Sequence, residues 1–163
     1  MVASMLVAGL MMCAAKREDL TEAEQDHIHA LEVWMEPKQI KGWYKLKTVA
    51  ERDQALKDAG LWDRFYSYDA ELRAAIIAGE VRTGWTGDRV YMAWGPPHQK
   101  KRLTGRNAGR SEGLVYRFEV AGDGSVMVWA PGSKETYGAV GKYTMEVVLD
   151  DNVVAEMNKK DGW

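Results

Sequence analysis

The segment from residue 74 to 97 constrains the fold most, because it joins the end of one helix to a short second helix and then stops that helix. Gly79 can end the first helix in the left-handed conformation, which costs glycine little. Thr86 has a side-chain oxygen that can cap the second helix. Gly95 can take the left-handed position at its end, and the two prolines that follow prevent continuation.

The short second helix has one apolar face. Val90, Tyr91 and Trp94 fall at positions i, i+1 and i+4, which share one side of a helix. Asp88 lies in the first turn, where a carboxylate is favourable near the positive end of the helix dipole. We therefore expect Val90 and Trp94, together with Trp85 just before the helix, to belong to the hydrophobic core.

Helix signals also precede this segment. Capping-box patterns begin at Thr21 and at Thr48 and predict a helix at each place. Pro37 is expected to end the first of these helices and Gly60 the second. A third helix is expected over 69–78, and the aromatic segments between the helices are expected to be connections, namely 42–44 and 61–66.

After the double proline the sequence alternates between apolar and polar residues, with turn residues between the runs, which is typical of antiparallel strands. Turns are expected over 121–124 and 150–152. The expected strands cover residues 114–119, 125–130, 142–149 and 153–157. Helix signals followed by strand signals favour an α+β fold: an N-terminal helical segment, then two helices packed on an antiparallel sheet of three or four strands.

The residues at the joint between helices and strands form a motif, whose positions are Gly84, Trp85, Thr86, Val90, Trp94, Gly95, Pro96 and Pro97. This motif resembles the signature of the SmpA/OmlA (BamE-like) domain of bacterial envelope lipoproteins, and it is similar to the motif of the GWxTD domain. The first resemblance implies two helices against a three-stranded antiparallel sheet over residues 72–163, with residues 20–71 as a helical extension. It also implies an accessory role in outer-membrane assembly or integrity.

Cys13 follows an uncharged and mostly apolar run over residues 2–12. This run is shorter than the roughly 20 residues of a transmembrane helix, and it has the length of a signal-peptide core. The residues ending in Cys13 resemble a bacterial lipobox. That implies lipidation of Cys13 and attachment to the periplasmic face of the outer membrane, with 1–19 as anchor and tether. The alternative is a buried N-terminal helix in which Cys13 is a small core residue.

Cys13 is the single cysteine of the chain, which excludes an internal disulfide and a cysteine-based zinc cluster. His27 and His29 are two apart on a predicted helix and point to different faces, so no metal site is expected. No cofactor-binding motif is recognised either. The glycines at 105, 109 and 113 lack the lysine and the helix start of a phosphate-binding loop and predict a flexible loop instead.

A basic run without acidic residues covers positions 100–110. It can contact an acidic protein face or lipid phosphates, or it can be a solvated loop that protects an edge strand. The expected contact residues are five cations and two aromatic residues on the neighbouring strands: Lys100, Lys101, Arg102, Arg106, Arg110, Tyr116 and Trp129. Nucleic acid is not expected as a partner, because the net charge of the chain is −2.

The sequence presents no recognisable set of acid, base and nucleophile. We therefore expect a non-catalytic envelope protein that binds another protein. Two alternatives are open. The first is a small envelope hydrolase that uses carboxylates of the sheet, with Glu112, Glu119, Asp123 and Glu146 as candidates. The second is a lipid- or glycan-binding module that uses an aromatic cluster, which is either core or contact surface and consists of Trp43, Tyr44, Trp62, Phe65 and Tyr66.

Overall fold

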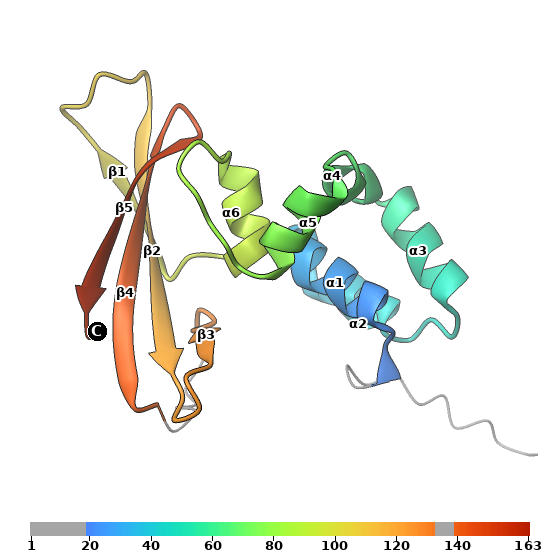
Figure 1. Ribbon diagram of the computed structural model, residues 1–163. Helices are drawn as coiled ribbons and strands as arrows, with labels where there is room; N and C mark the ends of the chain where they lie inside the picture. The colour runs from blue at the N-terminus through green and yellow to red at the C-terminus, as the bar shows by residue number, and fades with distance from the viewer. Residues whose placement is uncertain (1–18, 133–138) are drawn as a thin grey trace, which may run out of the picture.

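The computed structural model describes residues 19–132 and 139–163, so Cys13 and nearly all of the predicted anchor lie outside the described residues. Helices α1 to α5 lie together on one side, the sheet lies on the other, and α6 lies between them (Figure 1). The helices are α1 (Glu22–Leu31), η2 (Glu32–Trp34, a 3-10 turn), α2 (Pro37–Trp43), α3 (Val49–Asp58), α4 (Trp62–Tyr66), α5 (Ala70–Ile77) and α6 (Gly87–Trp94). The strands are β1 (Gln99–Leu103), β2 (Ser111–Val120), β3 (Val126–Val128), β4 (Gly141–Asp150) and β5 (Val153–Asp161).

Both predicted capping boxes are present. At the start of α1, Thr21 Oγ1 accepts from the backbone N–H of Glu24, and the Glu24 carboxylate accepts from the backbone N–H of Thr21 at 2.9 Å. At the start of α3, Thr48 and Glu51 make the same reciprocal pair, with distances of 3.2 and 3.0 Å. Each box satisfies backbone donors that a helix N-terminus leaves free, so both helices begin where the sequence predicts.

Two aromatic segments that were expected to be connections are helices instead. α1 ends at Leu31, and Pro37 starts α2 rather than ending the preceding helix. Proline suits the first position of a helix because the N–H that it lacks has no partner there. A capping box holds the start of α2, in which the Glu36 backbone N–H donates to Gln39 Oε1 at 2.7 Å. α4 occupies the second aromatic segment and buries Phe65.

The 74–97 segment contains the two expected helices, α5 and α6. Gly79 follows α5 with a φ of 73°, and Gly95 follows α6 with a φ of 71°, so both glycines take backbone conformations that other residues avoid. Thr86 is the N-cap residue of α6, but its side chain makes no capping hydrogen bond, so that expectation was wrong. The backbone of this corner bonds to the β4–β5 turn instead, because the Gly87 N–H donates to the Asn152 carbonyl at 3.0 Å.

The antiparallel sheet has the order β1-β2-β4-β5, and β3 pairs with β2. The predicted mixture of helix and antiparallel sheet is confirmed, with five strands in place of three or four. β1 was expected to be loop, yet its basic residues pair in register with β2 from Gln99↔Val115 to Leu103↔Ser111. The predicted turn between β4 and β5 is present, and Asp151 and Asn152 both have positive φ, as a tight type I′ hairpin turn requires.

The face of the sheet toward the helices is apolar. Leu114, Tyr116 and Phe118 alternate along β2, and their cross-strand partners Val147, Met145 and Tyr143 share that face. The core joins this face to α6 and the helical layer. Trp85 and Val90 are buried, as expected, with 6% and 0% of their surfaces exposed. Trp94 is only half-buried, because part of its indole lines an open groove.

Candidate binding groove

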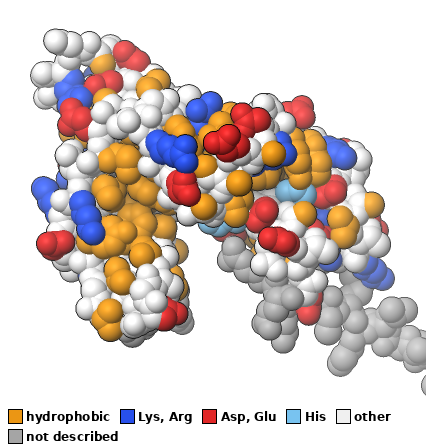
Figure 2. Space-filling model, in the orientation of Figure 1, with side chains coloured by type: hydrophobic (Ala, Val, Ile, Leu, Met, Phe, Trp, Pro, Cys, Tyr) orange, Lys and Arg blue, Asp and Glu red, His pale blue; other side chains and the backbone are white. Residues whose placement is uncertain are grey.

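A groove of about 740 Å³ lies where the ends of α1, α5 and α6 meet the lower half of the sheet. The helices cover only the upper half of the apolar sheet face (Figure 1). Hydrophobic side chains gather on the uncovered half, beside the hollow between the sheet and the helical part (Figure 2). This groove is the candidate functional site, since an apolar concave surface with a few polar groups is the usual form of a binding site.

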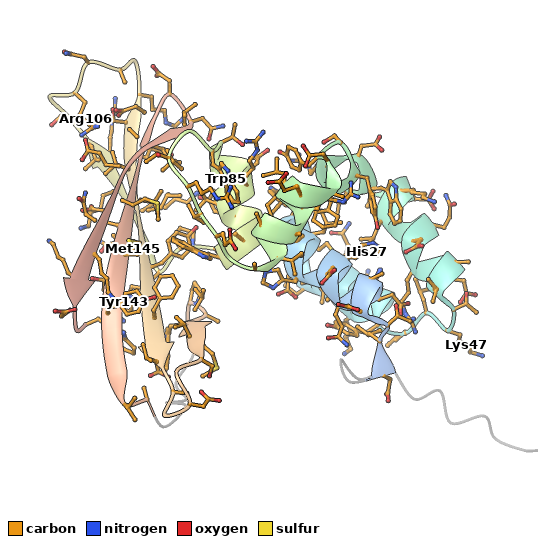
Figure 3. The ribbon with its side chains drawn as sticks, in the orientation of Figure 1. His27, Lys47, Trp85, Arg106, Tyr143 and Met145 are labelled. Atoms are coloured by element: carbon orange, nitrogen blue, oxygen red, sulfur yellow. The ribbon has the colours of Figure 1, made fainter. Side chains whose placement is uncertain are left out.

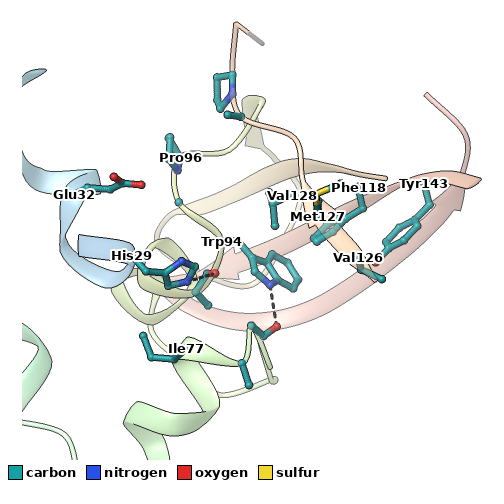
Figure 4. A pocket seen from close by; sticks show the side chains of 16 residues that line it. His29, Glu32, Ile77, Trp94, Pro96, Phe118, Val126, Met127, Val128 and Tyr143 are labelled. Carbon is teal, nitrogen blue, oxygen red and sulfur yellow. Dashed lines mark hydrogen bonds between the residues drawn. The ribbon is translucent and has the colours of Figure 1, made fainter. Parts of the chain in front are cut away.

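Aromatic rings form the floor of the groove. Phe118 and Tyr143 stack with their centroids 4.8 Å apart and an interplanar angle of 6°. The indole of Trp94 meets Phe118 edge-on at 5.0 Å. Val126 and Val128 of β3 extend this floor, and 51% of the Val126 surface is exposed (Figure 4). Rings fixed by mutual contact lose little side-chain entropy on binding, which favours them as contact surface.

Two hydrogen bonds fix the helix side of the groove. Trp94 Nε1 donates to the Gly79 carbonyl at 2.9 Å and so joins the ends of α6 and α5 (Figure 4). His29 Nε2 lies 3.2 Å from the Ala93 carbonyl, so this nitrogen carries the proton in the bond that joins α1 to α6. Glu32 is the acidic residue of the lining, and the described lining contains neither lysine nor arginine.

The basic residues expected to contact a partner lie elsewhere, at the upper tip of the sheet and on β1 (Figure 3, Arg106). Arg106 donates to both carboxylate oxygens of Asp150, at 2.8 and 3.1 Å, and to Glu156 at 2.7 Å. Arg106, followed by the Ser111 hydroxyl, holds the pKa of Asp150 at about 2. These groups neutralise the charge of Arg106 within the sheet.

The other cations of this run are also paired, except one. Arg110 bonds to Glu112, Lys101 Nζ lies 3.6 Å from Glu146, and Lys100 Nζ lies 4.9 Å from the centroid of the Tyr91 ring. Arg102 is exposed and has no ion-pair partner among the described residues. The run is therefore a set of internal ion pairs along an edge strand rather than an uncompensated basic patch.

The two aromatic residues proposed to accompany this run do not share its surface. Tyr116 is 1% exposed and donates from its hydroxyl to the Gly95 carbonyl at 3.1 Å, so it belongs to the core. Burial, followed by the nearby Tyr91, raises the pKa of Tyr116. Trp129 is 8% exposed and packs against Trp163 at 5.1 Å.

The carboxylates considered for a hydrolase are held apart by different partners. Glu119 is buried with its Oε1 3.4 Å from Lys142 Nζ, and Asp123 accepts from the backbone and hydroxyl of Ser125 in the β2–β3 turn. Glu112 and Glu146 pair with Arg110 and Lys101 as described above. Each of these four carboxylates therefore has a basic or hydroxyl partner of its own.

A buried polar cluster within the helical part was missed in the sequence. His27, which is 3% exposed, lies with Nε2 2.5 Å from the Tyr66 hydroxyl and Nδ1 3.4 Å from Asp53 Oδ1 (Figure 3). Burial lowers the pKa of His27, and the Asp53 charge partly opposes this effect. Burial also raises the pKa of Tyr66, which disfavours a phenolate nucleophile. The sequence signal that could have indicated burial of His27 is its position next to Ile28, which lies on the apolar face of a predicted helix.

The aromatic cluster of the sequence surrounds this histidine in part. Trp43 and Phe65 are buried, Trp62 stacks on Tyr66 with centroids 4.2 Å apart, and Tyr44 packs edge-on against Trp43 at 5.3 Å. Most of the cluster is therefore core, with the Tyr66 ring at its exposed margin. The part of the chain that the structure describes holds no group of three potential metal ligands.

No family model, no curated protein and no solved structure matches this chain. Within the described ranges no helix has the length and apolarity to cross a bilayer.

Proposed function

We propose that this chain is a non-catalytic binding protein whose groove holds an apolar segment of a partner protein. The observation that carries the proposal is the half of the sheet face that the described helices leave uncovered, where Phe118, Tyr143, Val126 and Val128 line an open concave surface. Exposure of such an apolar surface to water is unfavourable in free energy, and burial against a partner removes this penalty. Ordered aromatic rings at its centre suit an interface hot spot.

We further propose that the protein acts in the bacterial envelope, exported and anchored through Cys13 at the periplasmic face of the outer membrane. The lipobox-like sequence and the SmpA/OmlA-like motif support this context. In such an arrangement α6 would be the helix next to the sheet, and α5 would pack on α6 (Figure 1). The partner would then be another envelope protein, with a role in outer-membrane assembly or integrity.

A lipid is the second candidate occupant, because the groove is apolar and large enough for part of an acyl chain. A hydrolase has less support, since each carboxylate considered for it has a separate partner.

The experiment that tests the proposal is photo-crosslinking in bacterial cells that express the full chain. A photoreactive amino acid replaces Val126, which is 51% exposed in the groove, and in a matched control it replaces Val49, which is 45% exposed on α3. We expect an adduct with a different protein from position 126 only. Mass spectrometry should place the adduct in a segment rich in large apolar residues. Equal adducts from both positions, or an adduct with lipid alone, would remove the protein-binding proposal.

A further inference from the structure

β5 forms one edge of the sheet, since the strand order is β1-β2-β4-β5 and β5 pairs with no described strand besides β4 (Figure 1). On an edge strand every second residue has its backbone N–H and C=O directed away from the sheet. The Gly162 N–H donates to the Lys142 carbonyl at 2.8 Å, which fixes this alternation along β5. The backbone groups of Met157, Lys159 and Asp161 therefore point outward, and they have no hydrogen-bond partner in the described part of the chain.

The beginning of β5 is protected, so only its later part is an open edge. The Gly84 N–H donates to the Val154 carbonyl at 2.8 Å, and the Val154 N–H donates to the Trp85 carbonyl at 2.7 Å. A β-bulge at Ala155 follows, since the register with β4 shifts at this point. The open edge therefore covers residues 156–161.

This open edge is complementary in charge to itself. Glu156 and Lys160 lie on the same face of the strand, and Asn158 lies midway between them. If two β5 strands pair antiparallel about a two-fold axis at Asn158, Glu156 of each copy lies opposite Lys160 of the other. Lys160 is exposed and makes no ion pair with any described residue. Glu156 accepts from Arg106 through Oε1, which leaves Oε2 for a second cation.

The neighbouring registers of such a pair are unfavourable. With the axis at Lys159 or at Lys160, the same lysine of both copies would lie opposite itself, and like charges in that position destabilise a strand pair. With the axis at Met157, the pairing would run into the bulge at Ala155. The axis at Asn158 avoids both problems and forms two ion pairs.

We propose that the protein forms a two-fold dimer in which the β5 strands of two copies pair antiparallel and join the two sheets into one. Met157 of each copy exchanges backbone hydrogen bonds with Lys159 of the other, which satisfies the outward groups. The other edge of the sheet is protected, because β1 carries Lys100, Lys101 and Arg102 in succession. The β5 edge does not line the groove, so this inference goes beyond the proposed function.

Disulfide trapping tests the register in the full chain, with Cys13→Ser removing its single cysteine. Asn158→Cys places two thiols directly opposite each other with Cβ atoms about 5 Å apart, close enough for a disulfide. Mild oxidation should therefore give a covalent dimer. Lys160→Cys should give none, because its two cysteines would lie roughly 13 Å apart along the paired strands. Arg102→Cys is the matched control, since it is an exposed position on the protected edge strand.

Sedimentation equilibrium in reducing buffer measures the dimer without a crosslink. The mass of the unchanged chain should approach that of two chains as the concentration rises. Lys160→Glu should raise the dissociation constant of the dimer about tenfold, because two like-charge pairs replace two ion pairs. Glu156→Lys in the same chain as Lys160→Glu should restore the affinity, because each pair then has opposite charges again.

The mass of one chain at every concentration would overturn the dimer. Trapping of Arg102→Cys as strong as that of Asn158→Cys would indicate random collision and would overturn the β5 pairing. A dimer that Lys160→Glu does not weaken would place the contact elsewhere and would also overturn it. These outcomes are separate from the Val126 crosslink, which tests the groove.

Discussion

Trp94 Nε1 donates a 2.9 Å hydrogen bond to the carbonyl oxygen of Gly79, which ties the end of α6 to the end of α5. The same indole packs on Phe118 of the sheet. One half-buried side chain therefore sets the position of α5 relative to the sheet at the wall of the groove. The shape of the groove depends on this contact.

Gly79→Ala and Gly60→Ala should destabilise the protein by similar amounts. Both glycines follow a helix with positive φ, 73° and 68°, so alanine costs roughly 1–2 kcal/mol at each. A Cβ at Gly79 would lie 3.4 Å from Trp94 Nε1, which is an ordinary van der Waals contact, and a Cβ at Gly60 meets nothing within 4 Å, so neither position adds a clash. Urea unfolding of both variants measures the two losses. A clearly larger loss for Gly79→Ala would mean that the left-handed turn at Gly79 and the Trp94 hydrogen bond depend on each other.

Gly87→Ala should destabilise the corner between α6 and the β4–β5 turn, although alanine favours helices. A Cβ at Gly87 would lie 2.4 Å from Asn152 Oδ1 and 3.1 Å from Leu149 Cδ1. Asn152→Gly should reduce this cost, because glycine tolerates the φ of 67° at position 152 and removes the nearer clash. A double-mutant cycle by chemical denaturation measures the coupling. Additive effects of the two substitutions would contradict the proposed contact.

The sequence was informative where local chemistry determines structure. The capping boxes of Thr21 and Thr48 use residues three apart, and the β4–β5 turn uses two neighbouring residues with positive φ, so neither needs knowledge of distant contacts. β1 was missed because its residues are mostly charged, and it is a strand only through pairing with β2. α2 was missed because Pro37 was expected to end a helix, although proline can also begin one. α4 was missed because it has only five residues and no side-chain cap at its start.

The groove could not be predicted from the sequence. It exists because α1 packs against α6 through contacts such as that of His29 with Ala93, which are 64 residues apart in the sequence. A local sequence pattern cannot predict a contact between residues so far apart. The ion pairs of the basic run could not be predicted for a similar reason. Arg106 finds its carboxylate partners on β4 and β5, about fifty residues later in the chain, so its net effect depends on the sheet register.

Arg106→Gln should lower the melting temperature, whereas Arg102→Gln should leave it nearly unchanged. Arg106 joins the end of β4 to β5 through Asp150 and Glu156, while Arg102 makes no ion pair within the described ranges. The pKa of Asp150 is about 2 in the folded state, below its ordinary value of 3.8. The ionised Asp150 therefore stabilises the fold fully at a pH above 3.8, and this contribution is lost as the pH falls from 3.8 to about 2. Differential scanning calorimetry from neutral to acidic pH measures both effects.

In Arg106→Gln the fall of the melting temperature in acid should be smaller than in the unchanged chain. Added salt should reduce the difference in melting temperature between the two proteins. If Arg102→Gln lowers the melting temperature as much as Arg106→Gln does, loss of any positive charge on the sheet tip matters and the specific bridge to Asp150 does not.

The buried His27 should make stability depend on pH near neutrality. Burial lowers the pKa of His27 below its ordinary 6.5, although Asp53, Asp26 and Glu24 oppose this. Because the unfolded chain then binds the proton more readily, the free energy of unfolding is highest above pH 6.5 and falls as the pH drops from there toward the lowered pKa. One proton contributes a slope of at most about 1.4 kcal/mol per pH unit.

His27→Gln should flatten this slope, because glutamine has no proton to gain in this range and can still hydrogen-bond to the Tyr66 hydroxyl. His98→Gln is the control, since it removes an imidazole from an exposed position before β1 and should leave the slope unchanged. Urea unfolding at a series of pH values measures all three proteins. If His27→Gln keeps the slope of the unchanged chain, the pH dependence comes from another group, and the buried imidazole takes up its proton without opposing the fold.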